Sequence, residues 1–503
     1  MHTLTPIRIP FALGLLALLA GCTLGPDYQP PDIPTPAAFK EPALSQGNAG
    51  WIATAPLRTA PFAAAPQNAW WTVFDDPILN GLEPRVAAAN QSLRAAYYAY
   101  QQTLALTQAA RAAAYPVLGA NASASRGDTG SADSGTQTGS QGARNTVSLG
   151  LTASWAPDVW GRVRRQVESS SANAAASADD LAAAQLSLQT TLAQNVFLIR
   201  QLDSQTALAR DTVAAYEKSL QRVQNRYAAG VVSQADVAQA QTQLAAARVQ
   251  LSGFGVQRAQ LEHAIAVLVG MAPADFNLPA MPSLPEPQAI PAGLPSQLLL
   301  RRPDLAAAER RVAAANAQIG VAESAYFPIL TLSAGGGYRS SSLAHLLSAP
   351  NLFWSLGPAL AQTLFDGGAR RAQVAQSQAA YQQTVAQYRQ TSLVALQQAE
   401  DQLAALAIYA QQAQQQQQLV AAAEHALRLI DNQYKAGTVP YLNVLSAQAA
   451  LYSAQNGRLQ NSGQRLTAGV ALIQALGGNW GEATKPALGG AVRDESERRA
   501  LNQ

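Results

Sequence analysis

The segment Val147–Trp155 reads Val-Ser-Leu-Gly-Leu-Thr-Ala-Ser-Trp, so that apolar residues alternate with small polar ones. Because successive side chains of a strand point to opposite faces, this period of two predicts a β-strand with one apolar face. The pattern predicts a first strand pair at about 117–126 and 145–156, and the same signals predict a second pair at about 329–340 and 352–365. Strands of about ten alternating residues are long enough to cross a bilayer.

Long helices are predicted directly after each strand pair. Residues 162–228 and 369–436 contain neither proline nor glycine, and at about 1.5 Å per residue each run would extend roughly 100 Å. Returning helices are expected to reach Gly270 and Gly477. The glutamine-rich tract Gln411–Gln418 is expected to be helical, because its flanks keep a seven-residue phase and glutamine is a good helix former.

A heptad spacing of mostly apolar positions passes along both long runs. Its members are Leu192, Ile199, Thr206, Val213, Leu220 and Tyr227 in the first run, and Val385, Ser392, Ala399, Leu406, Ala413, Val420, Leu427 and Tyr434 in the second. A seam of this kind requires neighbouring helices to bury it. We therefore expect both long helices to pack side by side with others.

The two halves of the chain resemble each other. Three local motifs recur in the same order at offsets of 212, 206 and 207 residues: Pro116 with Pro328, Gly161 with Gly367, and Tyr227 with Tyr434. Self-similarity of this kind is the signature of an internally repeated fold. We expect a first repeat over 71–280, a second over 281–480 and a polar C-terminal tail at 481–503.

The N-terminus is predicted to be an export signal followed by a lipid anchor. Residues 1–21 have a positively charged start and an apolar stretch that is too short to span a bilayer, as is typical of a signal peptide. The stretch ends in Leu-Ala-Gly-Cys, which resembles the lipobox of bacterial lipoproteins, so we expect Cys22 to be acylated and anchored in lipid rather than buried as a structural cysteine. In the bacterial sorting rule that this resemblance implies, an Asp after the cysteine would retain the lipoprotein at the inner membrane; the residue there is Thr23, so we expect the outer membrane. The Pro-rich stretch 22–70 is expected to form an extended strap.

Composition excludes most other functional classes. The net charge is +3 and only 13% of the residues are charged, so there is no electrostatic footprint for nucleic acid. The single cysteine excludes an intrachain disulfide framework, and the four histidines lack the spacing of a metal-ligand motif. Gly335–Gly337 lacks the Lys and Ser/Thr of a phosphate-binding loop. We therefore expect no enzyme, no cofactor, no metal site and no nucleic-acid partner.

The strand number requires more than one chain. Four strands cannot close a membrane barrel, since the smallest single-chain barrels have about eight. Open strand edges are excluded from lipid because each unpaired backbone group there costs several kcal/mol. Other copies of the same chain must therefore complete the sheet. The predicted fold is α+β, with a membrane β-barrel to which each chain contributes four strands, continuous with a barrel of long periplasmic helices.

Two motifs carry a resemblance to a known family. Residues 299–305 read Leu-Leu-Arg-Arg-Pro-Asp-Leu, with Ala-Tyr-Phe-Pro at 325–328, and residues 434–439 read Tyr-Lys-Ala-Gly-Thr-Val, with Tyr-Leu-Asn-Val-Leu at 441–445. In these motifs the chain resembles the TolC-like outer membrane factor family, and within it the lipoprotein branch of efflux channels. The resemblance implies a homotrimer with a twelve-stranded barrel and a twelve-helix periplasmic tunnel. It also implies a tripartite RND-type pump, in which an inner-membrane transporter and a periplasmic adaptor, or membrane fusion, protein are the partners.

The function that the resemblance implies is a passive duct through which small toxic compounds or drugs leave the cell. Two alternatives stay open. The chain could be the outer-membrane duct of a protein secretion system, or a structural coiled-coil lipoprotein without a pore. In the last case the alternating hairpins would be water-soluble.

The same resemblance places the candidate functional residues at the two predicted helix tips. Adaptor docking is assigned to Gly230, Val231, Val232, Gly437, Thr438 and Val439, and the periplasmic gate to Tyr227, Asp236, Tyr434, Lys435 and Asn443. The glycines are also expected to be helix caps. For Tyr434, packing in the heptad core is the structural alternative to a role in the gate.

Departures from the family pattern change the expected gate. Val439 stands where some members have an arginine, and Asn443 and Ser446 stand where they have acidic residues. We therefore expect closure to rely on apolar contacts and hydrogen bonds, with Asp236 paired to Arg226 or Lys435.

Overall fold

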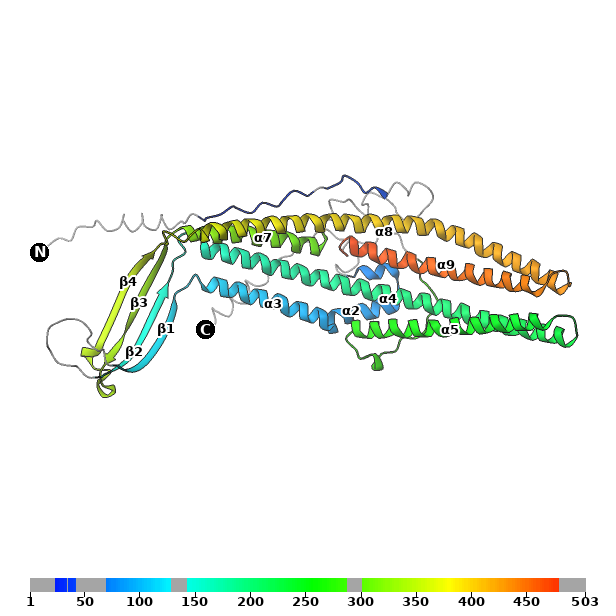
Figure 1. The fold of residues 1–503 in the computed structure, drawn as a ribbon, viewed down its shortest axis with the longest axis horizontal. Coiled ribbons are helices and arrows are strands. Elements are labelled where there is room, and N and C mark those ends of the chain that lie inside the picture. The colour runs from blue at the N-terminus through cyan, green and yellow to red at the C-terminus, as the bar shows by residue number, and fades with distance from the viewer. Residues whose placement is uncertain (1–22, 34, 42–68, 128–142, 287–300, 479–503) are drawn as a thin grey trace. The chain divides into compact units, whose positions relative to one another are not determined.

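The computed structural model describes residues 23–33, 35–41, 69–127, 143–286 and 301–478 (Figure 1). The predicted signal peptide, Cys22 and the C-terminal tail lie outside these ranges. In chain order the described elements are η3 (Trp70–Phe74), α2 (Pro77–Ala89), α3 (Gln91–Ala112), β1 (Val117–Gly127), β2 (Arg144–Trp155), α4 (Arg162–Ala228), α5 (Gln234–Leu268), η4 (Pro273–Asp275), α7 (Pro303–Glu323), η5 (Ser324–Tyr326), β3 (Ile329–Ser340), η6 (Leu343–His345), η7 (Ala349–Asn351), β4 (Leu352–Ala361), α8 (Ala369–Lys435) and α9 (Tyr441–Ala475).

The four strands form one antiparallel sheet in the order β1-β2-β3-β4 (Figure 1). The central pairing, β2 with β3, joins the two sequence repeats, with Leu149 opposite Tyr338. The last strand ends at Ala361, before the predicted end at residue 365, because Ala361 pairs with Ile329, the first residue of β3. Pro328 precedes Ile329 and has no backbone N–H to continue the ladder.

The long helices have the same lengths in both halves. α4 and α8 contain 67 residues each, and α5 and α9 contain 35 residues each. The tract Gln411–Gln418 lies inside α8, as expected. In the described ranges, no helix has both the length and the hydropathy that a membrane-spanning helix needs.

The chain divides into two compact units that cut across the sequence repeats. The first contains the sheet and the described residues within 1–32, 99–178 and 307–388; the second contains the described residues within 33–98, 179–306 and 389–503. Each unit therefore takes segments from both repeats, because strands and helices of one half pair with those of the other. The predicted repeats describe the duplication in the sequence, and they do not coincide with the compact units.

The second unit has an extensive hydrophobic core. Leu79, Phe197 and Ile473 are fully buried there, and the rings of Phe74 and Phe197 lie 4.9 Å apart. Each such side chain contributes about 1.5–3 kcal/mol by leaving water. Glu83 is also fully buried, and neither of its carboxylate oxygens has a hydrogen-bond partner among the described residues. Burial raises the pKa of Glu83 to about 9, so its carboxyl group is protonated at neutral pH.

The heptad seam behaves differently in the two long helices. On α8 the predicted positions are all buried or half-buried, from Val385 to Tyr434. On α4 the predicted positions from Leu192 to Leu220 are likewise buried or half-buried, and the prediction is wrong at Tyr227, which is 47% exposed. Beyond Ile199 the more deeply buried positions lie three residues later, at Leu202, Ala209, Tyr216 and Val223. They are the second apolar position of the same heptad, since the two seam positions of a heptad lie three residues apart.

Candidate functional site: the sheet faces and the helix tips

The sheet has one apolar face and one polar face, and both follow from its register. Leu151 pairs with Gly336, and Gly336 pairs with Trp354, so that these residues share one face. Large apolar side chains on this face are exposed, among them Leu118, Leu149, Leu151, Trp354, Leu356 and Leu360. The alternate positions carry Asn121, Ser123, Ser148, Thr152, Ser333 and Ser355. An apolar patch of this extent on a lone chain marks a surface that is covered by lipid or by protein.

The strand lengths agree with a bilayer crossing. The four strands contain 10 to 12 residues, and a tilted membrane strand needs about 9–11. Together with the alternation of the two faces, this length is typical of strands in an outer-membrane barrel.

The two helix tips have the same backbone geometry. Gly230 and Gly437 adopt left-handed conformations, with φ of 73° and 76°. The N–H groups of Val231 and Thr438 donate to carbonyls five residues earlier, at 2.9 and 3.0 Å. This pattern is the Schellman cap, in which glycine is favoured because it has no Cβ. Both glycines are therefore helix caps; their role in adaptor docking stays a prediction.

The predicted docking residues point in different directions. Val231 is 60% exposed and Thr438 is exposed. Val232 and Val439 are half-buried and contact a small apolar cluster formed by Val223, Ala240, Tyr434, Tyr441, Val444 and Leu445. Of the predicted docking residues, each tip thus exposes its glycine and one side chain.

Tyr434 is the best-connected of the predicted gate residues. Its ring is buried and lies 5.5 Å from the ring of Tyr441. On α4, the Arg226 guanidinium carbon lies 4.5 Å from the centre of the Tyr434 ring, and Arg226 Nη1 donates to the Tyr434 carbonyl at 3.2 Å. The Tyr441 hydroxyl shares a 2.9 Å hydrogen bond with Ser219 Oγ, and burial raises the pKa of Tyr441. The ends of α4 and α8 are therefore linked through Tyr434.

The predicted pairing of Asp236 with Arg226 or Lys435 is wrong. Asp236 Oδ2 accepts from the Ser233 N–H at 3.0 Å, and Ser233 Oγ accepts from the Asp236 N–H at 3.3 Å. These reciprocal bonds form a capping box that begins α5. Arg226 is placed on Tyr434 instead, and Lys435 Nζ pairs with Asp431 at 2.6 Å.

The remaining gate candidates, Tyr227 and Asn443, are exposed and stay predictions. Sequence reasoning missed Tyr441 and Ser219 as members of the tip. Tyr441 begins the Tyr-Leu-Asn-Val-Leu motif at 441–445, which is the signal that could have found it. Ser219 has no comparable signal, since its role depends on a partner 222 residues away.

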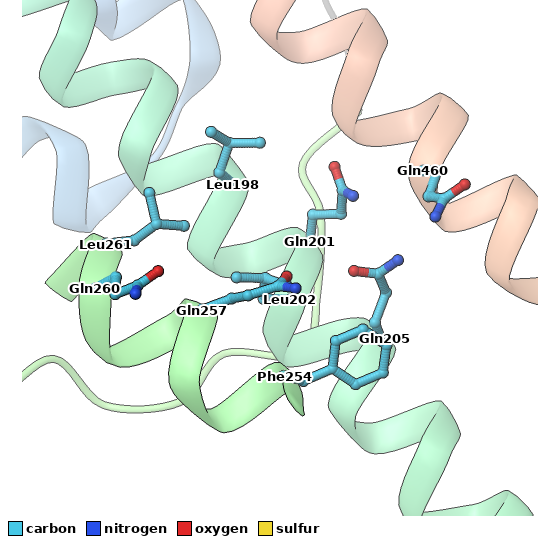
Figure 2. Close-up of a pocket in the computed structure, with 9 residues that line it drawn as sticks. All are labelled: Leu198, Gln201, Leu202, Gln205, Phe254, Gln257, Gln260, Leu261 and Gln460. Carbon is cyan, nitrogen blue, oxygen red and sulfur yellow. The ribbon is translucent and has the colours of Figure 1, made fainter. Parts of the chain in front are cut away.

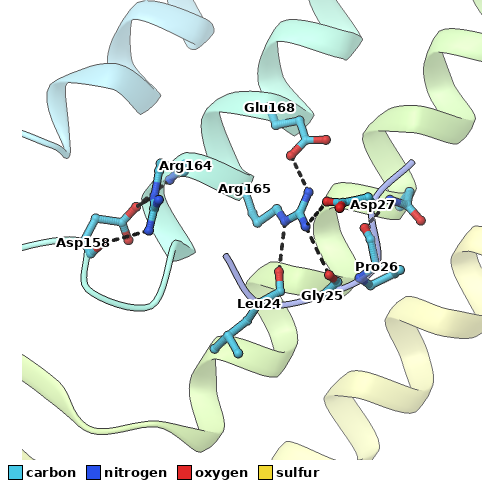
Figure 3. Close-up of polar contacts among 9 residues, drawn as sticks. Leu24, Gly25, Pro26, Asp27, Asp158, Arg164, Arg165 and Glu168 are labelled. Atoms are coloured by element: carbon cyan, nitrogen blue, oxygen red, sulfur yellow. Dashed lines mark hydrogen bonds and ion pairs between the residues drawn. The ribbon is translucent and has the colours of Figure 1, made fainter. Parts of the chain in front are cut away.

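The N-terminal segment of the first unit is clamped by Arg165 (Figure 3). This buried arginine donates to the carbonyls of Leu24 and Gly25 at 2.9 and 3.1 Å, and it pairs with Asp27 at 2.9 Å and Glu168 at 2.8 Å. Gly25 has a φ of 90°, and a Cβ there would collide with the Cα of Gly320, so this position requires glycine.

Two further contacts hold the same segment. Asn316 Nδ2 donates to the Pro26 carbonyl at 2.8 Å, and the Tyr28 hydroxyl donates to Glu309 at 2.5 Å. Thr23 approaches Gly161, the residue just before α4 at the end of the β2–α4 connection. The chain immediately after Cys22 is therefore fixed where the sheet meets α4.

A hollow of about 440 Å³ lies in the second unit among α4, α5 and α9 (Figure 2). It is lined by Leu198, Gln201, Leu202, Gln205, Phe254, Gln257, Gln260, Leu261 and Gln460. The lining thus combines apolar leucine and phenylalanine side chains with glutamine amides, which donate and accept hydrogen bonds but do not titrate. Gln205 already donates to Asn456 on α9 at 2.8 Å.

Comparison with known proteins agrees with this geometry. Residues 84–271 and 294–478 match the family described as outer membrane efflux protein. The chain belongs to the outer membrane efflux protein family. It is 33% identical to the probable efflux pump outer membrane protein TtgC of Pseudomonas putida, over 93% of this chain and 94% of that protein. It is 30% identical to the cation efflux system protein CusC of Escherichia coli, over 94% and 98% of the two chains.

Solved structures of outer membrane efflux proteins share the fold. The outer-membrane channel OprN has a TM-score of 0.80 and 30% identity, over 91% of this chain and 100% of that chain. The Neisseria gonorrhoeae MtrE outer membrane channel has a TM-score of 0.77 and 28% identity, over 91% and 98%. The expected α+β channel fold, outer-membrane location and function as an efflux duct are confirmed.

The second arginine of the Leu-Leu-Arg-Arg-Pro-Asp-Leu motif, Arg302, has a structural role in this outer membrane efflux protein. Arg302 is buried and pairs with Asp304 at 2.6 Å. Its Nη1 donates to the Ala475 carbonyl at 3.1 Å, at the last residue of α9, where a cation is favoured by the helix dipole. The motif therefore fixes the beginning of α7 to the end of α9.

Proposed function

We propose that three copies of this chain assemble into one continuous duct with a twelve-stranded barrel. The observation that carries the proposal is the open, two-faced sheet. β1 and β4 are its edges, and their backbone groups would be unpaired in lipid at a cost of several kcal/mol each. Edge pairing between copies satisfies these groups, places the apolar face toward lipid and encloses the polar face as the lumen. Three copies supply the number of strands that the family resemblance implies.

In this proposal the long helices continue the barrel as a periplasmic tunnel. The tips around Gly230 and Gly437 form its closed end and the docking surface for a periplasmic adaptor protein, beyond which lies an inner-membrane transporter. Arg226, Tyr434, Tyr441 and Ser219 hold adjacent helix ends together in the closed state. The supporting observation is that these contacts join α4 to α8 and α9 within the last turns before the tips.

The N-terminus is proposed to be anchored by acylated Cys22. The clamp around Arg165 supports this, because it holds residue 23 beside Gly161, in the connection between β2 and α4, at the level expected for the membrane surface. Each acyl methylene that is buried in the bilayer stabilises the anchor by about 0.8 kcal/mol.

The cargo is proposed to be small toxic organic compounds, and the duct to be passive, without chemistry of its own. The relatives include a toluene efflux pump outer membrane protein and an antibiotic efflux pump outer membrane protein, both of Pseudomonas putida. Deletion of the gene should increase susceptibility to a panel of antibiotics, dyes and solvents, and re-expression should restore resistance.

The assembly is tested with the full-length lipoprotein in detergent and in planar bilayers. We expect a trimer that dissociates only on heating in denaturing gels and that gives stepwise currents after reconstitution. A stable monomer without current would contradict the proposed duct.

A further inference from the structure

A cation–aromatic pair lies on the polar face of the sheet. In the register, Asn121 pairs with Gly150, Gly150 with Gly337, and Gly337 with Phe353, so these four residues form one row across the strands. A Cβ at Gly150 would lie 3.7 Å from Phe353 Cζ. The ring of Phe353 therefore reaches from β4 to β2, over Gly337 on the strand between them. The two glycines leave the space in which the ring can lie against the sheet.

Arg339 covers this ring. Its guanidinium carbon lies 5.1 Å from the centre of the Phe353 ring, within the range of a cation–π contact. Arg339 stands two residues after Gly337 on β3 and so belongs to the same polar face. The side chain is exposed, so its charge faces the space in front of the sheet.

The position of the pair along the strands is equally specific. β1 follows α3 and β2 continues toward α4, so the β1–β2 and β3–β4 connections lie at the opposite end of the sheet. Arg339 is the second-last residue of β3 and is near that far end. In the proposed duct this end is the exit to the exterior.

The charged residues of the four strands are all positive. The residues of the four strands include three arginines, Arg126, Arg144 and Arg339, and no aspartate or glutamate. By alternation Arg126 belongs to the apolar face, whereas Arg339 is fixed on the polar face by Phe353. A narrow, low-dielectric passage concentrates the field of such charges on the ions that pass through it.

We propose that Arg339, held in place by Phe353, gives the exit of the duct a preference for anions over cations. This inference rests on the proposed trimer, in which three copies of the pair face one lumen. Anionic compounds and the anionic forms of weak acids are then favoured at the exit, and cationic compounds pass less readily. Phe353 is a positioning residue, because the aromatic face limits the directions that the guanidinium can take.

The test measures the reversal potential of the purified full-length trimer in a planar bilayer under a potassium chloride gradient. We expect the wild type to favour chloride, Arg339→Gln to lower the chloride-to-potassium permeability ratio roughly threefold, and Arg339→Glu to favour potassium. Arg339→Lys should keep the preference. Phe353→Leu should lower it by less than Arg339→Gln does.

Arg126→Gln is the matched control, because it removes one strand arginine from the other face and should leave the ratio unchanged. Heat-resistant trimers must be seen for each variant, and if Arg339→Gln forms none, the comparison of Arg339→Lys with Arg339→Glu decides. If both the wild type and Arg339→Gln conduct and have equal chloride-to-potassium permeability ratios, this inference is overturned while the proposed duct stands. A wild type without channels would overturn the proposed duct and the inference together.

Discussion

Arg226 and Tyr434 form a double contact between α4 and α8: the guanidinium lies over the ring, at 4.5 Å from its centre, and also donates to the backbone carbonyl at 3.2 Å. Arg226 lies two residues before the end of α4 and Tyr434 one residue before the end of α8, and Tyr434 lies against Tyr441 at the start of α9. A closed tunnel end needs contacts of this kind, because helix ends fray unless side chains hold them.

Arg226→Gln should therefore weaken the closed state. A cation–π contact of this type contributes about 0.5–2 kcal/mol, so the open probability in planar bilayers should rise by roughly fivefold. Arg210→Gln is the matched control, because it removes an exposed arginine of α4 that lies sixteen residues before Arg226. An open probability equal to that of the wild type would remove Arg226 from the gate.

Asp236→Ala should act on helix stability and not on the gate. The substitution removes one half of the capping box of α5 and should cost about 1 kcal/mol locally. Faster amide hydrogen exchange over residues 234–240, together with single-channel currents like those of the wild type, is the expected result. Increased conductance would mean that Asp236 takes part in closure after all.

Arg165→Met should release the N-terminal segment. The substitution keeps much of the apolar stem but removes the donors to Leu24 and Gly25 and the pair with Asp27. Amide hydrogen exchange over residues 24–28 should then be several times faster than in the wild type, with the trimer intact. Arg164→Gln is the control, since Arg164 pairs with Asp158. Equal exchange rates for Arg165→Met and the wild type would show that other contacts hold the segment.

Leu356→Arg and Ser355→Arg should separate the two faces of the sheet. These two positions are adjacent on β4 and belong to opposite faces of the sheet. An arginine on the lipid face near the middle of a membrane strand costs about 2–4 kcal/mol, so Leu356→Arg should reduce the amount of heat-resistant trimer in outer membranes. Ser355→Arg should assemble normally. The opposite order would mean that the faces are assigned the wrong way round.

Glu83→Gln should remove a pH dependence of stability. The pKa of Glu83 is about 9 in the folded chain and near 4.5 when unfolded, so between these values the folded state binds more protons. Stability therefore falls as pH rises through this window, by at most about 1.4 kcal/mol per pH unit, and is insensitive to Glu83 below it. Denaturation midpoints of detergent-solubilised wild type at pH 6, 7 and 8 should decline. Midpoints for Glu83→Gln that decline equally would show that Glu83 is ionised in the folded chain.

Local patterns in the sequence predict the strands and long helices well. The alternation from Val147 to Trp155 arises because one face of the sheet is apolar and the other is polar. The long runs without proline or glycine favour helix. The heptad of α8 was predicted correctly because its phase is unbroken from Ser392 to Tyr434. On α4 the more deeply buried positions, from Leu202 to Val223, could not be predicted, because they depend on which neighbouring helices α4 meets.

Side-chain partners were predicted less well, since they depend on segments far apart in the chain. Asp236 is satisfied by Ser233, three residues away, and is no longer free to pair with Arg226. The clamp of Arg165 joins residues about 140 positions apart, and no local pattern reveals it. Glycine positions gave more reliable signals, since Gly230 and Gly437 both take the conformation that glycine favours.

The pairing of β2 with β3 has a consequence for how such a molecule could arise. Each half of the gene encodes one β-hairpin and one pair of long helices. Within the chain the two halves are joined by the antiparallel pairing of β2 with β3, which is the same kind of edge contact as that proposed between chains. Six unfused halves would close the same ring as three fused ones. In a fused chain the first and second halves alternate around the ring, so the two halves can diverge in sequence. Ser233 and Pro440, which precede the equivalent helices α5 and α9, are an example.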